Sequence, residues 1–403
     1  MFIISDFVIL YPLIVSIVWI CGSIFFSIMQ HQEKVLGKNN LNTFPLVSVL
    51  IPAHNEEKTL HEVVESVFNL KYKNIELILI DDGSTDKTLS IMKSFQSMYN
   101  SRLKVKVVPI VVNGGKANAL NQGLPYASGE FLLCLDSDSY IDENALNNIM
   151  PYFQNKKVGA VAGRPVVRNR TTLLGRLELL EYIGIIDIIK RGQAFITGHI
   201  TTVSGVIVAY RKSAITDVNN WTVEALTEDI DMTWKLYSKK WNVVYCPQAV
   251  SWILVPEKVR DLIRQRRRWA RGGLEVLINR RDMFINGRLA EQWLLLDMVL
   301  SNAWAICCVF AVLMYFFIVI FTHSLILDGG ILFVLVILSI TQFIIGFFSS
   351  KRQGYVDVRD LLLLPLYIVF YWVVNLVSCT SALASFFIDP SRKGTWSSPD
   401  RGV

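Results

Sequence analysis

The stretch Ile75-Glu-Leu-Ile-Leu-Ile-Asp-Asp-Gly-Ser-Thr-Asp86 joins a short apolar, β-branched run to an acidic turn. Four similar apolar runs occur at 46–51, 105–112, 131–135 and 158–162. Two polar segments with helical spacing, 57–69 and 86–98, separate some of them. Strands that alternate with helices predict an α/β domain with a mostly parallel, Rossmann-like sheet. Ligands of such sheets bind beyond the carboxyl ends of the strands, where the acidic residues and glycines of this chain lie.

Acidic residues follow two of these runs directly. Asp82 either belongs to a plain strand-to-helix turn with Gly83 or offers its carboxylate to a base or ribose. Asp136 and Asp138 are one residue apart, so they form either a solvated turn or a pair that shares a hard divalent cation. Such a cation would in turn hold phosphate oxygens.

Two further motifs place charged side chains at expected helix starts. Asp229, in Thr227-Glu-Asp229, either belongs to an N-capping turn or acts as a general base beside an acceptor hydroxyl. Lys116 follows Gly114-Gly115, but this is no P-loop because neither Ser nor Thr comes next. A lysine that opens a helix after a backbone turn can still meet a pyrophosphate.

The segment 259–279 is strongly basic, with six arginines between Arg260 and Arg271. It is either an interfacial helix beside a membrane or a phosphate-binding helix, because the planar arginine fork fits phosphate. The candidates for binding fall within about one helical turn, namely Gln265, Arg268 and Trp269. Two others are expected to face lipid headgroups, namely Arg266 and Arg267.

Apolar composition indicates a membrane protein that also contains a soluble domain. Hydrophobic residues make up 52% of the chain and charged residues 18%. Four runs are free of Asp, Glu, Lys and Arg, at 7–32, 298–327, 329–350 and 361–388. The first is too long for a signal peptide and lacks a basic flank, which predicts a retained anchor. The net charge of the chain is +6, and its basic residues cluster near these runs. This distribution favours the lipid bilayer over nucleic acid as a partner.

The distribution of lysine and arginine predicts a multi-pass protein of the cell membrane with a cytoplasmic catalytic domain. Lys34 and Lys38 follow the first run, and Lys351, Arg352 and Arg359 flank the loop before the last one. The last run contains Pro365 and is either one tilted span or a re-entrant pair, so the side of the C-terminus stays open. The expected division is a 1–33 anchor, a 34–257 catalytic domain, 258–292 amphipathic interfacial helices, a 293–390 transmembrane cluster of about three spans, and a 391–403 polar tail.

The motifs, taken in order, resemble those of the processive family 2 glycosyltransferases. They are Pro52-Ala-His-Asn-Glu56, Asp81-Asp82-Gly83, Asp136-Ser-Asp138, Thr227-Glu-Asp229 and Gln265-Arg-Arg-Arg-Trp269. Four further stretches resemble the branch that makes poly-β-1,6-N-acetylglucosamine for the biofilm matrix, at 115–123, 202–206, 252–257 and 395–402. The resemblance implies a GT-A domain inserted between transmembrane helices.

The same resemblance implies the substrates, the cofactor and the roles of the site residues. The donor is UDP-N-acetylglucosamine, the acceptor is the growing polysaccharide chain, the cofactor is a divalent cation (Mg²⁺ or Mn²⁺), and the partner is a small membrane accessory subunit. Asp229 is the expected base, and Asp136 and Asp138 are the expected ligands of the cation and UDP. Binding of the nucleotide, the diphosphate and the acceptor end is assigned to Glu56, Asp82, Lys116, Gln265, Arg268 and Trp269. His54 departs from the family pattern, which often has an aromatic residue or cysteine there.

Alternatives of three kinds stay open. The first is a synthase of another β-linked polymer, such as chitin oligosaccharide, hyaluronan or cellulose, which uses the same motifs. The second is a transferase that moves one sugar onto a lipid phosphate, although such enzymes usually lack the Gln-x-x-Arg-Trp element found at 265–269. The third is a channel or scaffold, which has no need for acidic residues at strand ends.

Overall fold

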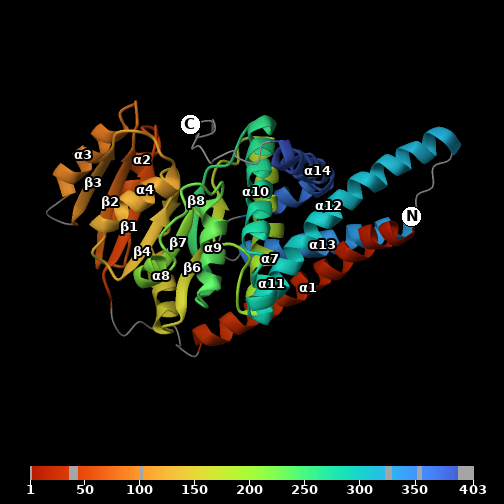
Figure 1. Ribbon diagram of the computed structural model, residues 1–403, viewed down its shortest axis with the longest axis horizontal. Helices are drawn as coiled ribbons and strands as arrows, with labels where there is room; N and C mark the ends of the chain where they lie inside the picture. Colours follow the sequence, from red (N-terminus) through yellow and green to blue (C-terminus); the bar gives the residue numbers. More distant parts are fainter. Residues whose placement is uncertain (1, 36–43, 100–102, 323–328, 352–355, 389–403) are drawn as a thin grey trace.

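A computed structural model describes residues 2–35, 44–99, 103–322, 329–351 and 356–388. A sheet domain lies at one end of the molecule and a group of long helices lies at the other (Figure 1). Helix α10 (Val259–Asn279) stands between the two parts (Figure 1). The expected tail 391–403 and the flanking residues Lys38 and Arg352 lie outside the described residues.

The sheet domain is built on eight strands, and the α/β prediction is confirmed. Their order across the sheet is β3 (Val105–Ile110), β2 (Ile75–Asp82), β1 (Val47–Ala53), β4 (Phe131–Leu135), β7 (Ile207–Arg211), β6 (Val158–Val167), β8 (Asn242–Ile253) and β5 (Tyr140–Ile141). The first four pair in parallel, β7 runs antiparallel between β4 and β6, and β8 is parallel to β6. All five predicted strands are present, whereas β5, β7 and β8 were not predicted.

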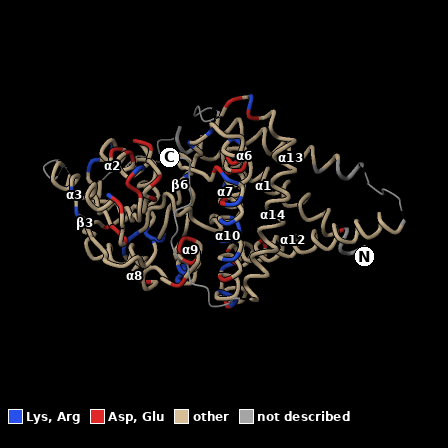
Figure 2. Tube along the Cα trace, turned by 90° about the horizontal axis from the view of Figure 1, so that it is seen from above, with Lys and Arg blue, Asp and Glu red and all other residues tan. Residues whose placement is uncertain are grey.

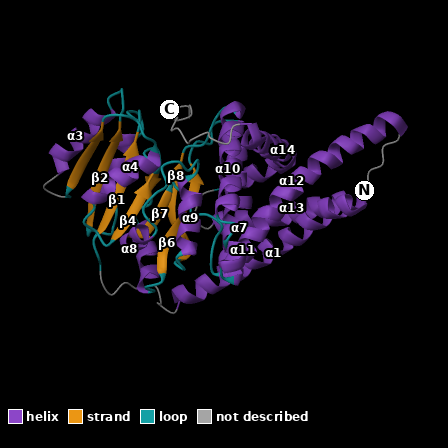
Figure 3. Ribbon diagram, viewed as in Figure 1, coloured by secondary structure: helices purple, strands orange, loops and turns teal. Residues whose placement is uncertain are grey.

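Helices cover both faces of the sheet (Figure 3). Because side chains alternate along a strand, Leu50 and Ile78 face one core while Val49 and Leu77 face the other. The first core includes α4 (Lys116–Gly123), α8 (Lys212–Asp217) and α9 (Glu228–Ser238). The second includes α2 (Leu60–Phe68), α3 (Thr88–Tyr99), α5 (Ala145–Ile149) and the short helix η2 (Met150–Gln154). Burial on both faces explains why the central strands are continuous apolar runs.

The segment between β6 and β7 connects the sheet domain to the long helices. It consists of α6 (Leu173–Glu181), the π-helical turn η3 (Tyr182–Ile186) and α7 (Asp187–Thr197). Helix α7 packs on α1, and a β-carbon built at Gly22 of α1 would lie 2.9 Å from the Gly192 Cα of α7. Small residues therefore allow the two backbones to approach closely, as in many membrane helix pairs.

The four long helices are α1 (Phe2–Val35), α12 (Leu289–Thr322), α13 (Gly329–Lys351) and α14 (Leu364–Ile388). Among the described residues, three segments are long and apolar enough to cross a membrane, namely Asp6–Gln32, Leu289–Phe321 and Val358–Ile388, and Val336–Ser350 forms a shorter apolar helix. These helices carry few charged residues, in contrast to the sheet domain and α10 (Figure 2). From Leu364 onward the last apolar run is one continuous α-helix with Pro365 in its first turn, which favours a single span over a re-entrant pair.

Short elements complete the described fold. They are the 3-10 helices η1 (Leu124–Tyr126) and η4 (Val358–Leu363) and the four-residue helix α11 (Met283–Asn286).

Candidate active site

Lys116 lies at the centre of a partly buried group of charged side chains, which we call the Lys116 cluster and which also contains Asp136, Glu228 and Asp229. The Lys116 Nζ lies 2.5 Å from Asp136 Oδ1 and 3.0 Å from Glu228 Oε1. It also donates a hydrogen bond to the carbonyl oxygen of Gly205 at 3.0 Å. Burial opposes the charge of the ammonium group, but Asp136 and Glu228 outweigh it and raise the pKa of Lys116. The fold therefore brings three separate sequence motifs into one site.

Local structure explains why these side chains converge. Asp136 follows the last residue of β4 directly, and Lys116 is the first residue of α4 after Gly115, whose φ of 85° favours glycine. Glu228 and Asp229 form the first turn of α9, where the positive end of the helix dipole favours carboxylates. Strand ends and helix starts thus meet at the carboxyl edge of the sheet.

Asp229 is held by two backbone N–H groups. Its Oδ2 accepts from Gly205 at 3.1 Å and its Oδ1 accepts from Ile230 at 2.9 Å. Burial and the neighbouring charge of Glu228 raise the pKa of Asp229, while Lys116 opposes that rise. Burial also acts on Glu228, but there Lys116 and Arg268 prevail and lower the pKa. Of the adjacent carboxyl groups, Asp229 is therefore the one with the higher affinity for a proton.

The sequence does not point to two residues at this site. Glu228 belongs to the Lys116 cluster and is the middle residue of the Thr227-Glu-Asp229 motif, but the sequence assigns it no role. Gly205 contacts the cluster through its backbone, and the sequence marks it only as part of the resembling stretch 202–206. A β-carbon built at Gly205 would lie 2.9 Å from Lys116 Nζ and 3.4 Å from Asp229 Oδ2. The absence of a side chain is therefore what lets this loop contact the cluster.

Asp138 and Glu56 lie in two turns that are joined by hydrogen bonds. Asp138 is 7% exposed, and its Oδ1 accepts from the Ser139 hydroxyl at 3.0 Å. The Thr59 hydroxyl makes contacts of 2.9 Å with Glu56 Oε2 and 3.0 Å with the Ser137 carbonyl oxygen. The loop after β1 is thereby tied to the turn that carries both predicted metal ligands.

Asp82 is fully buried at the end of β2 and binds the loop that leads into α4. Its two carboxylate oxygens accept from the backbone N–H groups of Gly114 at 3.0 Å and Gly115 at 2.8 Å. Burial raises the pKa of Asp82 against these two hydrogen bonds. The neighbouring Asp81, to which no role was assigned, has a buried Oδ1 without a hydrogen-bond partner among the described residues. Asp81 is therefore the carboxylate here with unused acceptor capacity.

Helix α10 places its motif residues beside the start of α9. The exposed Arg268 donates to the Leu226 carbonyl oxygen at 3.2 Å. A β-carbon built at Gly272 would lie 2.0 Å from the Thr227 hydroxyl, so the two helices can approach closely only with glycine there. Gln265 has a buried Oε1 with no hydrogen-bond partner in the described part of the chain, and Trp269 is partly buried. The basic helix thus borders the site.

Comparison with known proteins agrees with this geometry. Residues 48–218 match the glycosyl transferase family 2 profile. The chain is 36% identical, over 98% of its own length and 98% of the relative, to the poly-β-1,6-N-acetyl-D-glucosamine synthase of Staphylococcus epidermidis. The chain belongs to glycosyl transferase family 2. The corresponding synthase of Staphylococcus aureus is 34% identical over 98% of both chains.

One solved structure also superposes on almost the whole chain. The mannosyltransferase PcManGT from Pyrobaculum calidifontis, in complex with GDP-Man and Mn²⁺, superposes with a TM-score of 0.59. It covers 93% of this chain and 98% of that one at 15% identity, which shows the fold alone. The predicted GT-A fold of this family 2 enzyme, with candidate membrane helices on both sides of the domain, is confirmed.

One prediction on the basic helix of this family 2 glycosyltransferase is wrong. Arg266 was expected to face lipid headgroups, but it is only 7% exposed. Its guanidinium group lies 3.2 Å from Glu178 Oε1 and 3.5 Å from Glu181 Oε1, both on α6. A buried guanidinium needs such carboxylate partners, and these come from a distant part of the sequence.

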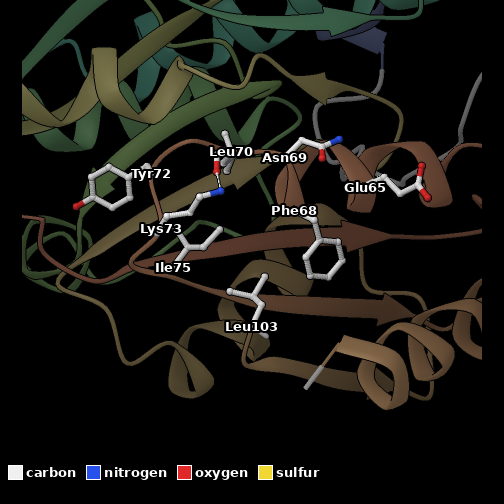
Figure 4. Close-up of a pocket in the computed structure, with 8 residues that line it drawn as sticks. All are labelled: Glu65, Phe68, Asn69, Leu70, Tyr72, Lys73, Ile75 and Leu103. Atoms are coloured by element: carbon white, nitrogen blue, oxygen red, sulfur yellow. Dashed lines mark hydrogen bonds between the residues drawn. The ribbon is translucent and has the colours of Figure 1, made fainter. Parts of the chain in front are cut away.

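A cavity of about 540 Å³ lies away from the charged cluster. It is lined by Phe68, Lys73, Ile75 and Leu103, among others, at the amino ends of β2 and β3 (Figure 4). Lys73 donates within the cavity wall to the Leu70 carbonyl oxygen at 2.6 Å. Because ligands of α/β sheets bind at the opposite, carboxyl edge, we assign this cavity no part in the reaction.

Proposed function

We propose that this family 2 enzyme polymerises N-acetylglucosamine from UDP-N-acetylglucosamine into poly-β-1,6-N-acetylglucosamine for the biofilm matrix. The observation that carries the proposal is the 36% identity to a synthase of that polymer over 98% of both chains. The Lys116 cluster supplies the charged groups that such a transfer requires. The growing polysaccharide chain is the acceptor.

The proposed reaction follows from the charges of the cluster. Asp229 takes the proton from the attacking 6-hydroxyl of the acceptor, because its raised pKa favours proton uptake. The hydroxyl oxygen bonds to the anomeric carbon as the bond to UDP breaks on the opposite face, so an α-linked donor gives a β-linked product. Lys116 and Arg268 offset the negative charge that develops on the departing diphosphate. Gln265 binds the diphosphate, and Trp269 stacks on the terminal sugar of the chain.

The nucleotide is proposed to lie over the loops after β1 and β2. Asp82 holds the 114–115 loop, and Glu56 is connected through the Thr59 hydroxyl to the turn that leads to Asp138. Asp82 and Glu56 therefore shape the nucleotide site and border the uridine and its phosphates. Asp81 is a second candidate for a base contact, because its Oδ1 is an acceptor with no partner in the described residues.

A divalent cation, Mg²⁺ or Mn²⁺, would be held by Asp136 and Asp138. Carboxylate oxygens are the ligands that these hard cations prefer, so the donors fit. Within the described residues no three His, Cys, Asp or Glu side chains are grouped to hold a metal, so the diphosphate and water would have to complete the coordination. A bound cation would supply Lewis-acid stabilisation of the diphosphate oxygens.

Product analysis tests the linkage and the sugar. Membranes that contain the enzyme are given labelled UDP-N-acetylglucosamine, and the polymer is digested either with a hydrolase specific for β-1,6-linked N-acetylglucosamine or with a chitinase. We expect complete digestion by the first and resistance to the second. The reverse pattern would identify a β-1,4-linked polymer and would refute the linkage while leaving the family 2 chemistry intact.

The enzyme is further proposed to be a multi-pass protein of the cell membrane whose 34–257 catalytic domain lies in the cytoplasm. The supporting observations are the three candidate spans and the sparse charge on the long helices (Figure 2). The 258–292 segment would lie at the membrane surface and the 293–390 segment within the membrane, beside a small accessory subunit. These placements bring the site to the side where nucleotide sugars are made.

Cysteine labelling tests this orientation. Lys93 is exposed on α3, and Lys93→Cys gives a reporter on the sheet domain. We expect a membrane-impermeant maleimide to label it only after cells are permeabilised. The unmodified chain, with its exposed Cys21, measures the background. Labelling of Lys93→Cys in intact cells, above that background, would place the domain outside.

A further inference from the structure

Arg266 belongs to a buried cluster that the proposed reaction does not use. Its Nη2 donates to both carboxylate oxygens of Glu178 at 3.2 Å, and its Nη1 lies 3.5 Å from Glu181 Oε1. We call Arg266, Glu178 and Glu181 the Arg266 cluster. All three side chains are less than 9% exposed. Burial raises the pKa of Glu178 to about 7, and although Arg266 opposes that rise, the neighbouring charge of Glu181 adds to it.

The guanidinium of Arg266 lies against the indole of Trp269. Its central carbon is 4.4 Å from the centroid of the ring, which is the geometry of a cation–π contact. Such contacts are strongest where water is excluded, as it is here. Because Glu178 and Glu181 hold the guanidinium in place, they also fix the position of the ring.

The same cluster contacts the last long helix. The Tyr367 hydroxyl of α14 donates to Glu181 Oε2, and the Tyr367 and Tyr371 rings stack with centroids 4.7 Å apart. The Arg266 guanidinium also lies 5.7 Å from the Tyr371 ring centroid. The contacts therefore connect α6, through Arg266, to α14, which has the composition of a membrane span.

Stability alone does not account for such a cluster. Well-packed apolar residues in place of a buried ion pair are often equally or more stabilising, because two charges must lose their water. What apolar residues would not provide is one defined orientation of the Trp269 ring. A planar guanidinium held by two carboxylates does provide it.

We propose that Arg266 is a positioning residue for the acceptor. It fixes the orientation of the Trp269 ring, against which the end of the growing chain binds. The orientation of this ring then determines how long the enzyme retains each chain. Glu178 and Glu181 act through Arg266, and Tyr367 links their position to α14. The inference rests on the proposed function, because it assigns the acceptor end to Trp269.

The variant Arg266→Lys tests this role. Lysine keeps the positive charge between the two carboxylates but lacks the planar group that covers the indole. We expect the KM for an N-acetylglucosamine oligosaccharide acceptor to rise about tenfold and the polymer chains to shorten. The KM for UDP-N-acetylglucosamine and the kcat at saturating acceptor are expected to stay within about threefold. Arg264→Lys, on an exposed arginine of the same helix, is the matched control and should leave all four quantities unchanged.

A double-variant comparison separates positioning from general support of the fold. If Arg266 acts through the ring, then Arg266→Lys has no further effect on acceptor KM in a Trp269→Ala enzyme. An equal effect in both backgrounds, or an equal rise in the KM of donor and acceptor, would overturn the proposal.

Tyr367→Phe removes only the hydroxyl bound to Glu181. This variant provides an alternative test if Arg266→Lys does not accumulate in membranes. A smaller rise in acceptor KM with shorter chains is expected, and unchanged values would overturn the proposal. Failure of the proposed function itself is distinct, because the unmodified enzyme would then make no polymer from UDP-N-acetylglucosamine.

Discussion

Asp229→Asn is expected to lower the rate of sugar transfer by about 10²–10⁴-fold while UDP binding changes little. The amide keeps the shape of the side chain but does not accept a proton at neutral pH. Its single oxygen can still accept the N–H of Gly205, which contacts Asp229 Oδ2 at 3.1 Å, so this loop is expected to stay in place although the bond from the Ile230 N–H to Oδ1 is lost. Turnover is measured as labelled polymer, and UDP binding by calorimetry on the purified enzyme.

Glu224→Gln is the matched control for this variant, because Glu224 is an exposed carboxylate in the loop just before the same helix. Its turnover is expected to be normal. Parallel losses of UDP affinity and turnover in Asp229→Asn would instead assign Asp229 to the structure of the helix start. The pH profile gives a second measurement. Since a base must be ionised and burial raises the pKa of Asp229, the rate should fall with decreasing pH earlier than an ordinary aspartate would cause.

Most of the carboxyl edge of the sheet, with its candidate site residues, could be predicted because it depends on local sequence. An apolar run that ends in Asp82 or Asp136 is both a strand and its carboxyl end, so the strand and the candidate ligand are identified together. Parallel pairing then brings these ends to one edge, as the register of Ala53 with Asp81 shows. No contact between distant residues is needed for that inference.

The strands that were not predicted have weaker local signals. Strand β8 contains Pro247, which normally argues against an inner strand. The structure accommodates it where the pairing with β6 is irregular, between Ala162 and Arg164 of that strand. Strand β7 has only five residues. It lies antiparallel between β4 and β6, and this position depends on the long connection through α6 and α7.

Arg266 shows the limit of reasoning from one segment. Three consecutive arginines at 266–268 give no indication of which one turns inward, because that depends on a partner elsewhere in the chain. The partners are Glu178 and Glu181, one helical turn apart on α6. Two carboxylates at that spacing in a segment otherwise rich in leucine indicate that a basic side chain is buried beside them, because buried charges require a counterion.

Asp138→Ala is expected to abolish polymer synthesis, and a chelator is expected to do the same to the unmodified enzyme. Asp136 is already engaged with Lys116 at 2.5 Å, so Asp138 is the carboxylate of the pair that remains outside the Lys116 cluster. Loss of a metal-derived stabilisation of several kcal/mol corresponds to a rate decrease on the order of 10³-fold.

The control for Asp138→Ala is Glu143→Gln, which changes a half-exposed carboxylate just beyond the same turn and breaks only a surface ion pair with Lys71. Polymer yield is measured for both variants, and for the unmodified enzyme in EDTA before and after addition of excess Mg²⁺ or Mn²⁺. Full activity in EDTA, or normal yield from Asp138→Ala, would show that the two carboxylates belong to an acidic turn without a cation. Recovery of activity with one metal but not the other would identify the ion, because the enzyme and its substrates are identical in both samples.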